Sequence, residues 1–376
     1  MVTTEDILMS LVRSALWQEA PSTEGFPLDE PSWYHLHFLA RKQTVQGIVY
    51  DAICQLPEDL LPPADLLIDW MREVQDIEAN YQQQLRALAW LTTRIEAESA
   101  LHPIILKGLP LAALYPTPSH RMSGDIDIFY GSAEAAEEAD RLVESWGNNI
   151  IRGKFGESAF SISHVLIEHH GYLVHSHVPV RKQRLTTWIE KRMTDTDATL
   201  QVSIADMPVS VLTPALDLIQ LSSHSLGHAL NEGVSVRQMC DLAIFAHHHH
   251  DTLSAAPLRQ LLSRFGLRGW TDLCLSYCTT YLGLPASRLP YPVKTRRSLL
   301  NAMHREVMLS GNFGQMDDRY EHTPEGNSAA TAQRISRNVW RYLRVAPLES
   351  TGMLTTLTAL WLKDRIFGKE EQPQQP

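Results

Sequence analysis

The sequence predicts an α+β fold in which a small sheet lies between two helical regions. Three observations lead to this prediction. Apolar residues recur at helical spacing up to about residue 100 and again from about residue 209 onward. Between these regions, residues 103–180 contain short apolar or alternating runs, which are typical of strands. The chain has 376 residues, of which 44% are hydrophobic, so a large core can form without disulfides or metals.

The N-terminal region, residues 1–100, is predicted to be helical. Ile7, Leu8 and Leu11 share one face of a first helix that Thr3 or Thr4 caps. A second helical pattern begins at Trp33. Pro62-Pro63 interrupts the chain, and a long helix is predicted over residues 64–99.

The central unit, residues 101–208, is predicted to mix strands and helices. An apolar strand ends at Lys107-Gly108, and residues 125–130 alternate as a half-buried strand does. The predicted strands are 104–106, 125–130, 149–154, 160–168 and 172–178, with helices at 109–115 and 133–146. The chain then returns to helical periodicity.

The C-terminal domain, residues 209–368, is predicted to be helical. The predicted helices lie at 214–230, 234–250, within 254–285, and at 293–310 and 328–366. The last residues, 369–376, are polar and are predicted to be disordered.

Charge and composition exclude several classes of protein. There are 33 Lys+Arg against 43 Asp+Glu, and the net charge of -10 disfavours a nucleic-acid polymer as a partner because phosphates would be repelled. No apolar run reaches the roughly 20 residues that a membrane helix needs. Acids at the N-terminus argue against a signal peptide, and four scattered cysteines argue against a disulfide framework. We expect a cytoplasmic protein.

The main chemical feature is Asp125-Ile126-Asp127. In a strand, residues i and i+2 face the same side, so both carboxylates project together. Two such charges repel unless a cation lies between them, and hard oxygen ligands favour Mg²⁺ or Mn²⁺. Taken alone, the same pattern is also typical of solvated surface acids.

A second feature, upstream of these acids, supports the metal interpretation. Lys107-Gly108 follows an apolar strand and opens a helix, which is the setting of a phosphate site. Gly108 allows close approach of the backbone, and Lys107 and Arg121 supply positive charge. Metal-binding acids beside a phosphate cradle indicate nucleotidyl transfer.

These elements resemble the signature of the uncharacterised nucleotidyltransferase family within the DNA polymerase β-like superfamily. The central match consists of Ile105-Leu106-Lys107-Gly108, Leu114-Tyr115-Pro116, Arg121 and Asp125-Ile126-Asp127-Ile128. The flanking helical signatures are matched by Trp33, Leu36, Leu39-Ala40 and Gly47, and by Leu212-Thr213-Pro214, His224, His228 and Asp241-Leu242-Ala243. The resemblance covers about residues 30–250.

The resemblance implies a polymerase β-like mixed sheet with flanking helices and a metal site at one edge. It also implies transfer of a nucleoside monophosphate from an NTP, by default ATP, with release of pyrophosphate. On this basis Asp125 and Asp127 bind Mg²⁺ (or Mn²⁺), while Lys107, Gly108 and Arg121 bind the nucleotide. We expect the acceptor to be a small molecule or a peptide or protein side chain. The alternatives are a catalytically degenerate nucleotide-binding sensor or scaffold of the same fold, and phosphotransfer.

The resemblance further implies a third carboxylate on a neighbouring strand. Glu168-His169-His170 fits the acid-x-His pattern of the family, and Glu168 would then act as general base or metal ligand. In a competing register His175 takes this position, and metal binding would be weaker. We favour Glu168.

The role of His224, His228 and Asp241 remains open between three readings. The two histidines are four residues apart on one helical face, and with Asp241 they could bind a metal. They could instead hydrogen-bond across a helix pair and hold the C-terminal domain together. In the third reading this domain covers the nucleotide, and one of the residues touches base or acceptor. The run His247–His250 is interpreted as the end of a helix.

Overall fold

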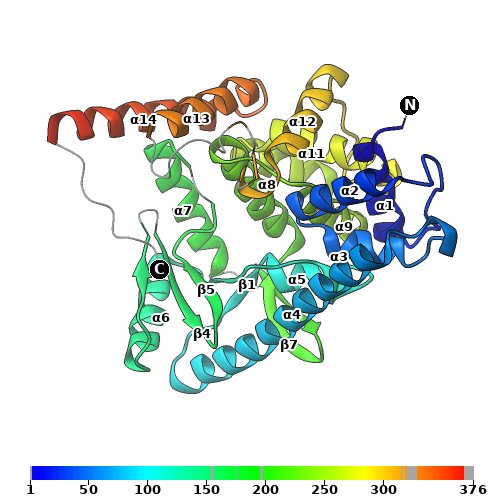
Figure 1. The fold of residues 1–376 in the computed structure, drawn as a ribbon. Helices are drawn as coiled ribbons and strands as arrows, with labels where there is room; N and C mark the ends of the chain where they lie inside the picture. The colour runs from blue at the N-terminus through cyan, green and yellow to red at the C-terminus, as the bar shows by residue number, and fades with distance from the viewer. Residues whose placement is uncertain are drawn as a thin grey trace.

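A computed structural model describes residues 2–153, 156–174, 176–194, 198–314, 316–317, 319 and 328–367. A mixed sheet lies at the centre of these residues, with the long helix α4 running beneath it and the C-terminal helices on its other side (Figure 1). The predicted α+β class, with a mixed sheet flanked by helices, is confirmed.

The main sheet has the strand order β1-β2-β5-β4-β3. Strands β2 and β5 are parallel, and the other neighbours pair antiparallel. The strands are β1 Ile104–Leu106, β2 Asp125–Phe129, β3 Ile151–Arg152, β4 Glu157–Ile162 and β5 Val165–His170. The two strands that carry the predicted acids, β2 and β5, are therefore direct neighbours.

The two faces of this sheet differ in character. Ile126, Ile128 and Ile167 are buried in an apolar cluster with residues of α4 and of α6, Ala133–Ser145. Because successive side chains of a strand alternate, Asp125 and Asp127 project from the opposite face. The covered face holds the sheet in place, and the other face is left to line a cavity.

The N-terminal helices join both halves of the molecule. They are α1 Thr4–Trp17, α2 Glu30–Lys42, α3 Gln46–Ile53 and α4 Ala64–Glu98, with a 3-10 turn η1 at Glu58–Leu60. Early α4 residues such as Trp70 pack with α1–α3, whereas later ones such as Leu88 pack beneath the sheet. Helix α4 therefore belongs to two hydrophobic clusters.

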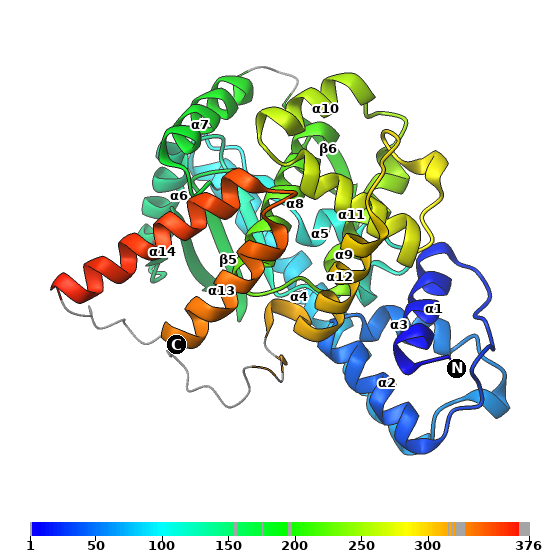
Figure 2. The same ribbon diagram turned by 90° about the horizontal axis from the view of Figure 1, so that it is seen from above.

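The C-terminal helices continue the first of these clusters. They are α8 Pro214–Asn231, α9 Val236–His249, α10 Ala255–Arg264, α11 Arg268–Tyr281, α12 Arg297–Ser310, α13 Ser328–Tyr342 and α14 Pro347–Phe367, with 3-10 turns η3 Ala286–Arg288 and η4 Asn312–Gly314. Helices α1–α3 lie at one end of the molecule and α6 and α7 (Pro179–Met193) at the other (Figure 2). Gln43 ties the N-terminal region to this domain, since its side chain bonds Val307 O and Val236 N, each at 2.9 Å.

Several elements differ from the sequence prediction. The single strand expected at 160–168 is two strands, β4 and β5, joined by a turn at Ser163 and His164. Residues 172–174 and 176–178 form no strand, although one was predicted there. Helix α7 and a separate hairpin, β6 Thr199–Ile204 with β7 Met207–Leu212, were not predicted.

Two predictions concern residues outside the described ones: the disorder of residues 369–376 and the alternative third position at His175. Among the helices that the structure describes, none has both the length and the apolar composition that crossing a bilayer requires. The proposed domain boundaries near residues 100 and 208 stay predictions.

Candidate active site

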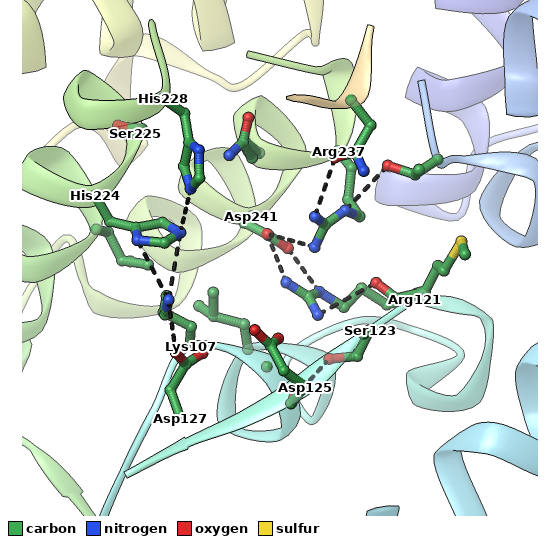
Figure 3. A pocket seen from close by; sticks show the side chains of 18 of the residues that line it. Lys107, Arg121, Ser123, Asp125, Asp127, His224, Ser225, His228, Arg237 and Asp241 are labelled. Carbon is green, nitrogen blue, oxygen red and sulfur yellow. Dashed lines mark hydrogen bonds and ion pairs between the residues drawn. The ribbon is translucent and has the colours of Figure 1, made fainter. Parts of the chain in front are cut away.

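A cavity of about 400 Å³ lies between the open face of the sheet and helices α8 and α9 (Figure 3). This volume falls within the range of small-molecule sites. Its floor is formed mainly by the segments 107–111, 121–127 and 166–168, and its opposite wall by residues of α8 and α9. The predicted residues that line it are Lys107, Gly108, Arg121, Asp125, Asp127, Glu168, His224, His228 and Asp241.

The predicted acids meet on this floor. Asp125 and Asp127 come from β2, and Glu168 of β5 is the direct register partner of Asp127. Asp127, Glu168 and His170 each offer one ligand atom, and these atoms lie within 4.8 Å of one another. Asp125 is outside this tight group but shares the strand face of Asp127. The parallel pairing of β2 with β5 thus places Glu168 beside Asp127 on a neighbouring strand, and its role as the third acid stays a prediction.

Asp127 is the most strongly held of these acids. Its Oδ1 accepts from Lys107 Nζ at 2.9 Å and from His170 Nε2 at 2.6 Å. Burial raises the pKa of Asp127, but the charge of Lys107 and the bond from His170 outweigh burial and hold this pKa well below its ordinary value. Asp127 is therefore ionised under all physiological conditions.

The other two acids are destabilised as anions. The charge of Asp127, followed by burial, raises the pKa of Asp125. Burial, followed by the charges of Asp127 and Asp125, raises the pKa of Glu168 to about 7. This pattern is expected where carboxylates crowd together in a buried site.

Lys107 occupies an unusual backbone position. It precedes the five-residue helix α5, Gly108–Ala112, with φ +47° and ψ -125°. A non-glycine residue in this region is strained, and such strain is typical of functional sites. Because α5 is so short, the Lys107 ammonium rather than a helix dipole supplies the positive charge here. Gly108 has little room for a side chain, since an added Cβ would lie 3.3 Å from Ser123 Oγ.

Arg121 has a partner other than a nucleotide. Its Nε and Nη2 bond Asp241 Oδ1 and Oδ2 at 3.0 and 2.8 Å, and Tyr115 donates to the same carboxylate at 2.7 Å. Burial raises the pKa of Asp241, and Arg121 brings it below its ordinary value. This pair joins the floor of the cavity to α9. The predicted contact of Arg121 with the nucleotide stays a prediction.

The loop that carries Arg121 is fixed by the N-terminal helices. It begins with the 3-10 turn η2, Pro118–His120, and His120 bonds Asp51 at 2.7 Å and Glu78 at 3.0 Å. Gly47 of α3 lies against the His120 carbonyl so closely that a Cβ would overlap it. This contact leaves no room for a side chain at position 47.

His224 and His228 do not combine with Asp241. Their Nε2 atoms lie 3.0 Å apart within α8, and His228 Nδ1 lies 3.1 Å from Glu232. Over the residues that the structure describes, no group of three metal-ligating side chains includes either histidine or Asp241. The metal reading of these three residues is thus not supported, because Asp241 bonds Arg121 instead. The two histidines hydrogen-bond to each other within α8.

Two residues near the acids were given no role by sequence reasoning, which named His170 only as part of the acid-x-His pattern. His170 stands two positions after Glu168, and strand alternation was sufficient to place it on the same face. Arg237 of α9 lines the cavity, and its Nε bonds Thr44 Oγ1 at 3.1 Å. Its spacing of four residues before Asp241 was the available signal.

Comparison with known proteins identifies the family of the chain. Residues 29–283 match the family described as uncharacterised nucleotidyltransferase, which confirms the expected resemblance and extends it beyond residue 250. No curated protein matches the chain. A crystal structure of an antigenic nucleotidyltransferase-like protein from Paracoccidioides brasiliensis shares 13% identity with it, with 53% of this chain and 91% of that chain covered. Its TM-score of 0.32 is too low to carry an argument.

Proposed function

The chain belongs to the uncharacterised nucleotidyltransferase family, and on this premise we propose that it is a metal-dependent nucleotidyltransferase. It moves a nucleoside monophosphate from an NTP to an acceptor and releases pyrophosphate. The observation that carries the proposal is the meeting of Asp125, Asp127 and Glu168 on one face of the sheet, inside a cavity that also holds Lys107.

The donor set suits a hard divalent cation. Asp125, Asp127 and Glu168 offer carboxylate oxygens, which Mg²⁺ and Mn²⁺ prefer, and His170 adds a nitrogen that Mn²⁺ tolerates well. The raised pKa values of Asp125 and Glu168 indicate that added positive charge would stabilise both anions. When bound, the cation would polarise the phosphates and activate the attacking oxygen.

The residues of the chain divide the remaining work. Asp127 is ionised and fixed by two donors, so it serves as an anchor. Glu168, with a pKa of about 7, is suited to accept the proton of the acceptor near neutral pH. Lys107 provides positive charge for the phosphates of the nucleotide, with ATP as the default substrate.

We expect the acceptor to be a small molecule or a peptide or protein side chain. A cavity of about 400 Å³ can hold a nucleotide and a small group, and the chain's net charge of -10 repels a nucleic-acid polymer. A nucleotide-binding sensor of the same fold is the alternative. Pyrophosphate release in the presence of labelled NTPs and candidate acceptors separates the two, since a sensor binds without turnover.

The direct test is the double substitution Asp125→Asn and Asp127→Asn. We expect it to abolish binding of Mg²⁺ with a non-hydrolysable ATP analogue in calorimetry, while circular dichroism stays unchanged. Asp69→Asn with Asp76→Asn, two exposed positions on α4, removes the same charge elsewhere and is the matched control. Unchanged affinity in the Asp125/Asp127 variant would refute the assignment.

A further inference from the structure

The cavity wall opposite the acids is one face of α8. Leu221, His224, Ser225 and His228 line it, and their spacing of three and four residues places them on one side of the helix. Figure 3 shows His224 and His228 above Lys107, in a connected row that ends at Asp127. The wall therefore presents imidazoles directly over the only lysine that lines the described cavity.

The contact between Lys107 and His224 is not directed at one nitrogen. Lys107 Nζ lies 3.3 Å from Nδ1 and 3.3 Å from Nε2 of the ring, whereas a hydrogen bond in the ring plane would favour one of them. Its shorter and directed contact is with Asp127, at 2.9 Å. The ammonium thus lies between an anionic partner and a weakly engaged ring.

This position conflicts with metal binding. Asp127 Oδ1 already accepts from both Lys107 and His170, so a divalent cation on this carboxylate would lie within a few Å of the ammonium. Like charges at such a distance in a buried site repel strongly. Lys107 must therefore move when the cation binds, and the cavity beside His224 is the adjacent space.

We propose that Lys107, His224 and His228 bind the terminal phosphates of the nucleotide, and that Lys107 exchanges its partner from Asp127 to these phosphates as the cation takes its place. The inference rests on the proposed function and adds that the α8 wall binds the terminal phosphates of the substrate. Metal and polyphosphate then bind cooperatively, because each relieves the charge that opposes the other. Nucleoside monophosphates, which lack terminal phosphates, gain little from α8.

The other cations of the cavity are less suited to this role. Arg121 is bonded through two nitrogens to Asp241 and is 3% exposed. Arg237 is engaged by Thr44 and lies 3.9 Å from Asp241. Both stand on the α9 side of the cavity, away from Asp127 (Figure 3).

The test uses Mn²⁺ and inorganic tripolyphosphate as probes, so that neither the base nor the acceptor has to be known. Free Mn²⁺ is followed by electron paramagnetic resonance and tripolyphosphate by calorimetry at saturating Mn²⁺. We expect Lys107→Met to tighten Mn²⁺ binding about tenfold in the absence of phosphate, and to weaken tripolyphosphate binding about tenfold. The two effects have opposite signs, which a merely misfolded variant cannot produce.

The histidines are tested with His224→Gln and His228→Gln. Each should leave Mn²⁺ binding unchanged and weaken tripolyphosphate at least about fivefold, with little effect on AMP. His248→Gln, an exposed histidine at the end of α9, is the matched control. Equal losses for AMP and tripolyphosphate would assign α8 to the base or sugar and overturn the proposal.

Two further outcomes separate this inference from the proposed function. If Lys107→Met leaves Mn²⁺ affinity unchanged or lowers it, the exchange is refuted, although the Asp125/Asp127 result can still support transferase activity. If the unaltered protein binds neither Mn²⁺ nor Mn²⁺ with tripolyphosphate, both the inference and the proposed function fail.

Discussion

Two buried ion pairs border the same cavity, and they are built differently. Arg121 donates two hydrogen bonds to Asp241, of 3.0 and 2.8 Å, and the Tyr115 hydroxyl donates a third to the same carboxylate. Lys107 meets Asp127 through one contact of 2.9 Å, on an oxygen that His170 shares. The guanidinium binds one carboxylate through two nitrogens, with Nη1 on the Met122 carbonyl, whereas the ammonium lies between Asp127 and the His224 ring.

This difference suggests a division of labour. A bidentate pair fixes geometry and resists exchange, which suits a tie between the cavity floor and α9. A lysine presents a compact charge on a flexible stem, which suits a group that changes partners. The strained backbone of Lys107 adds to the contrast, since strain is retained where function requires a residue to be held.

The largest expected effect comes from Arg121→Met. Without Arg121, the buried Asp241 keeps only Tyr115 and the more distant Arg237, and the free energy of unfolding should fall by about 3 kcal/mol. Lys107→Met, the matched substitution at the other pair, should cost at most about half as much because His170 still donates to Asp127 at 2.6 Å. Urea unfolding of both variants measures this. Equal losses would show that the two pairs have the same structural role.

The next effect concerns Glu168→Gln and depends on pH. The pKa of Glu168 is about 7 in the folded chain against an ordinary value of 4.5, so folding disfavours its anion. The cost in folding stability from burying the Glu168 anion is therefore fully present above pH 7. It declines as the pH falls and vanishes below pH 4.5, where the carboxyl is protonated in both states. At pH 8 the free energy of unfolding of the variant should exceed that of the unaltered protein by up to about 3 kcal/mol. At pH 4 the two should be equally stable. Thermal melts at several pH values test this, and added Mn²⁺ should shrink the gain.

A smaller effect is expected from His170→Gln. His170 either contributes a nitrogen to the cation or orients Asp127 through its 2.6 Å contact. In both cases Mn²⁺ affinity should fall by about 10–100-fold. Nitrogen coupling in the pulsed paramagnetic resonance spectrum of bound Mn²⁺ distinguishes direct ligation from orientation. An unchanged affinity would leave Lys107 as the sole partner that matters for Asp127.

The smallest effect is expected at the histidine run. His248→Gln changes an exposed side chain that is not among the residues lining the cavity. The unfolding free energy should stay within about 0.5 kcal/mol and Mn²⁺ binding should not change. A measurable loss of Mn²⁺ affinity would reveal a second binding place that competes with the acids in every titration described above.

The sequence was sufficient for the elements whose periodicity is strong. The helix predicted at 64–99 is α4, and the alternation at 125–130 correctly placed both aspartates on one face of β2. Glu168 could be favoured because Glu168-His169-His170 fits the acid-x-His pattern of the family. A wall of the cavity was only one of three readings of His224 and His228. Periodicity indicates that they share a helix face, but it does not show that this face packs over Lys107, more than 100 positions earlier in the chain.

The two hairpins were missed for a shared physical reason. Each turns through two consecutive non-glycine residues with positive φ, Ser163-His164 between β4 and β5 and Ala205-Asp206 between β6 and β7. In a sequence, two-residue hairpin turns are usually recognised by the dipeptides Asn-Gly or Asp-Gly. Without these signals, residues 160–168 resembled one strand. Helix α7 was missed because it is polar, and Leu185 and Ile189 are its buried residues.

Helix α4 has a consequence for how the whole chain responds to a ligand. With 35 residues it spans about 50 Å, and its first half is anchored among α1–α3 while its second half supports the sheet. Neither half can melt without breaking the helix that the other half needs. A nucleotide bound in the cavity should therefore raise the melting temperature of the described chain as one transition, including regions such as α1 that never touch it.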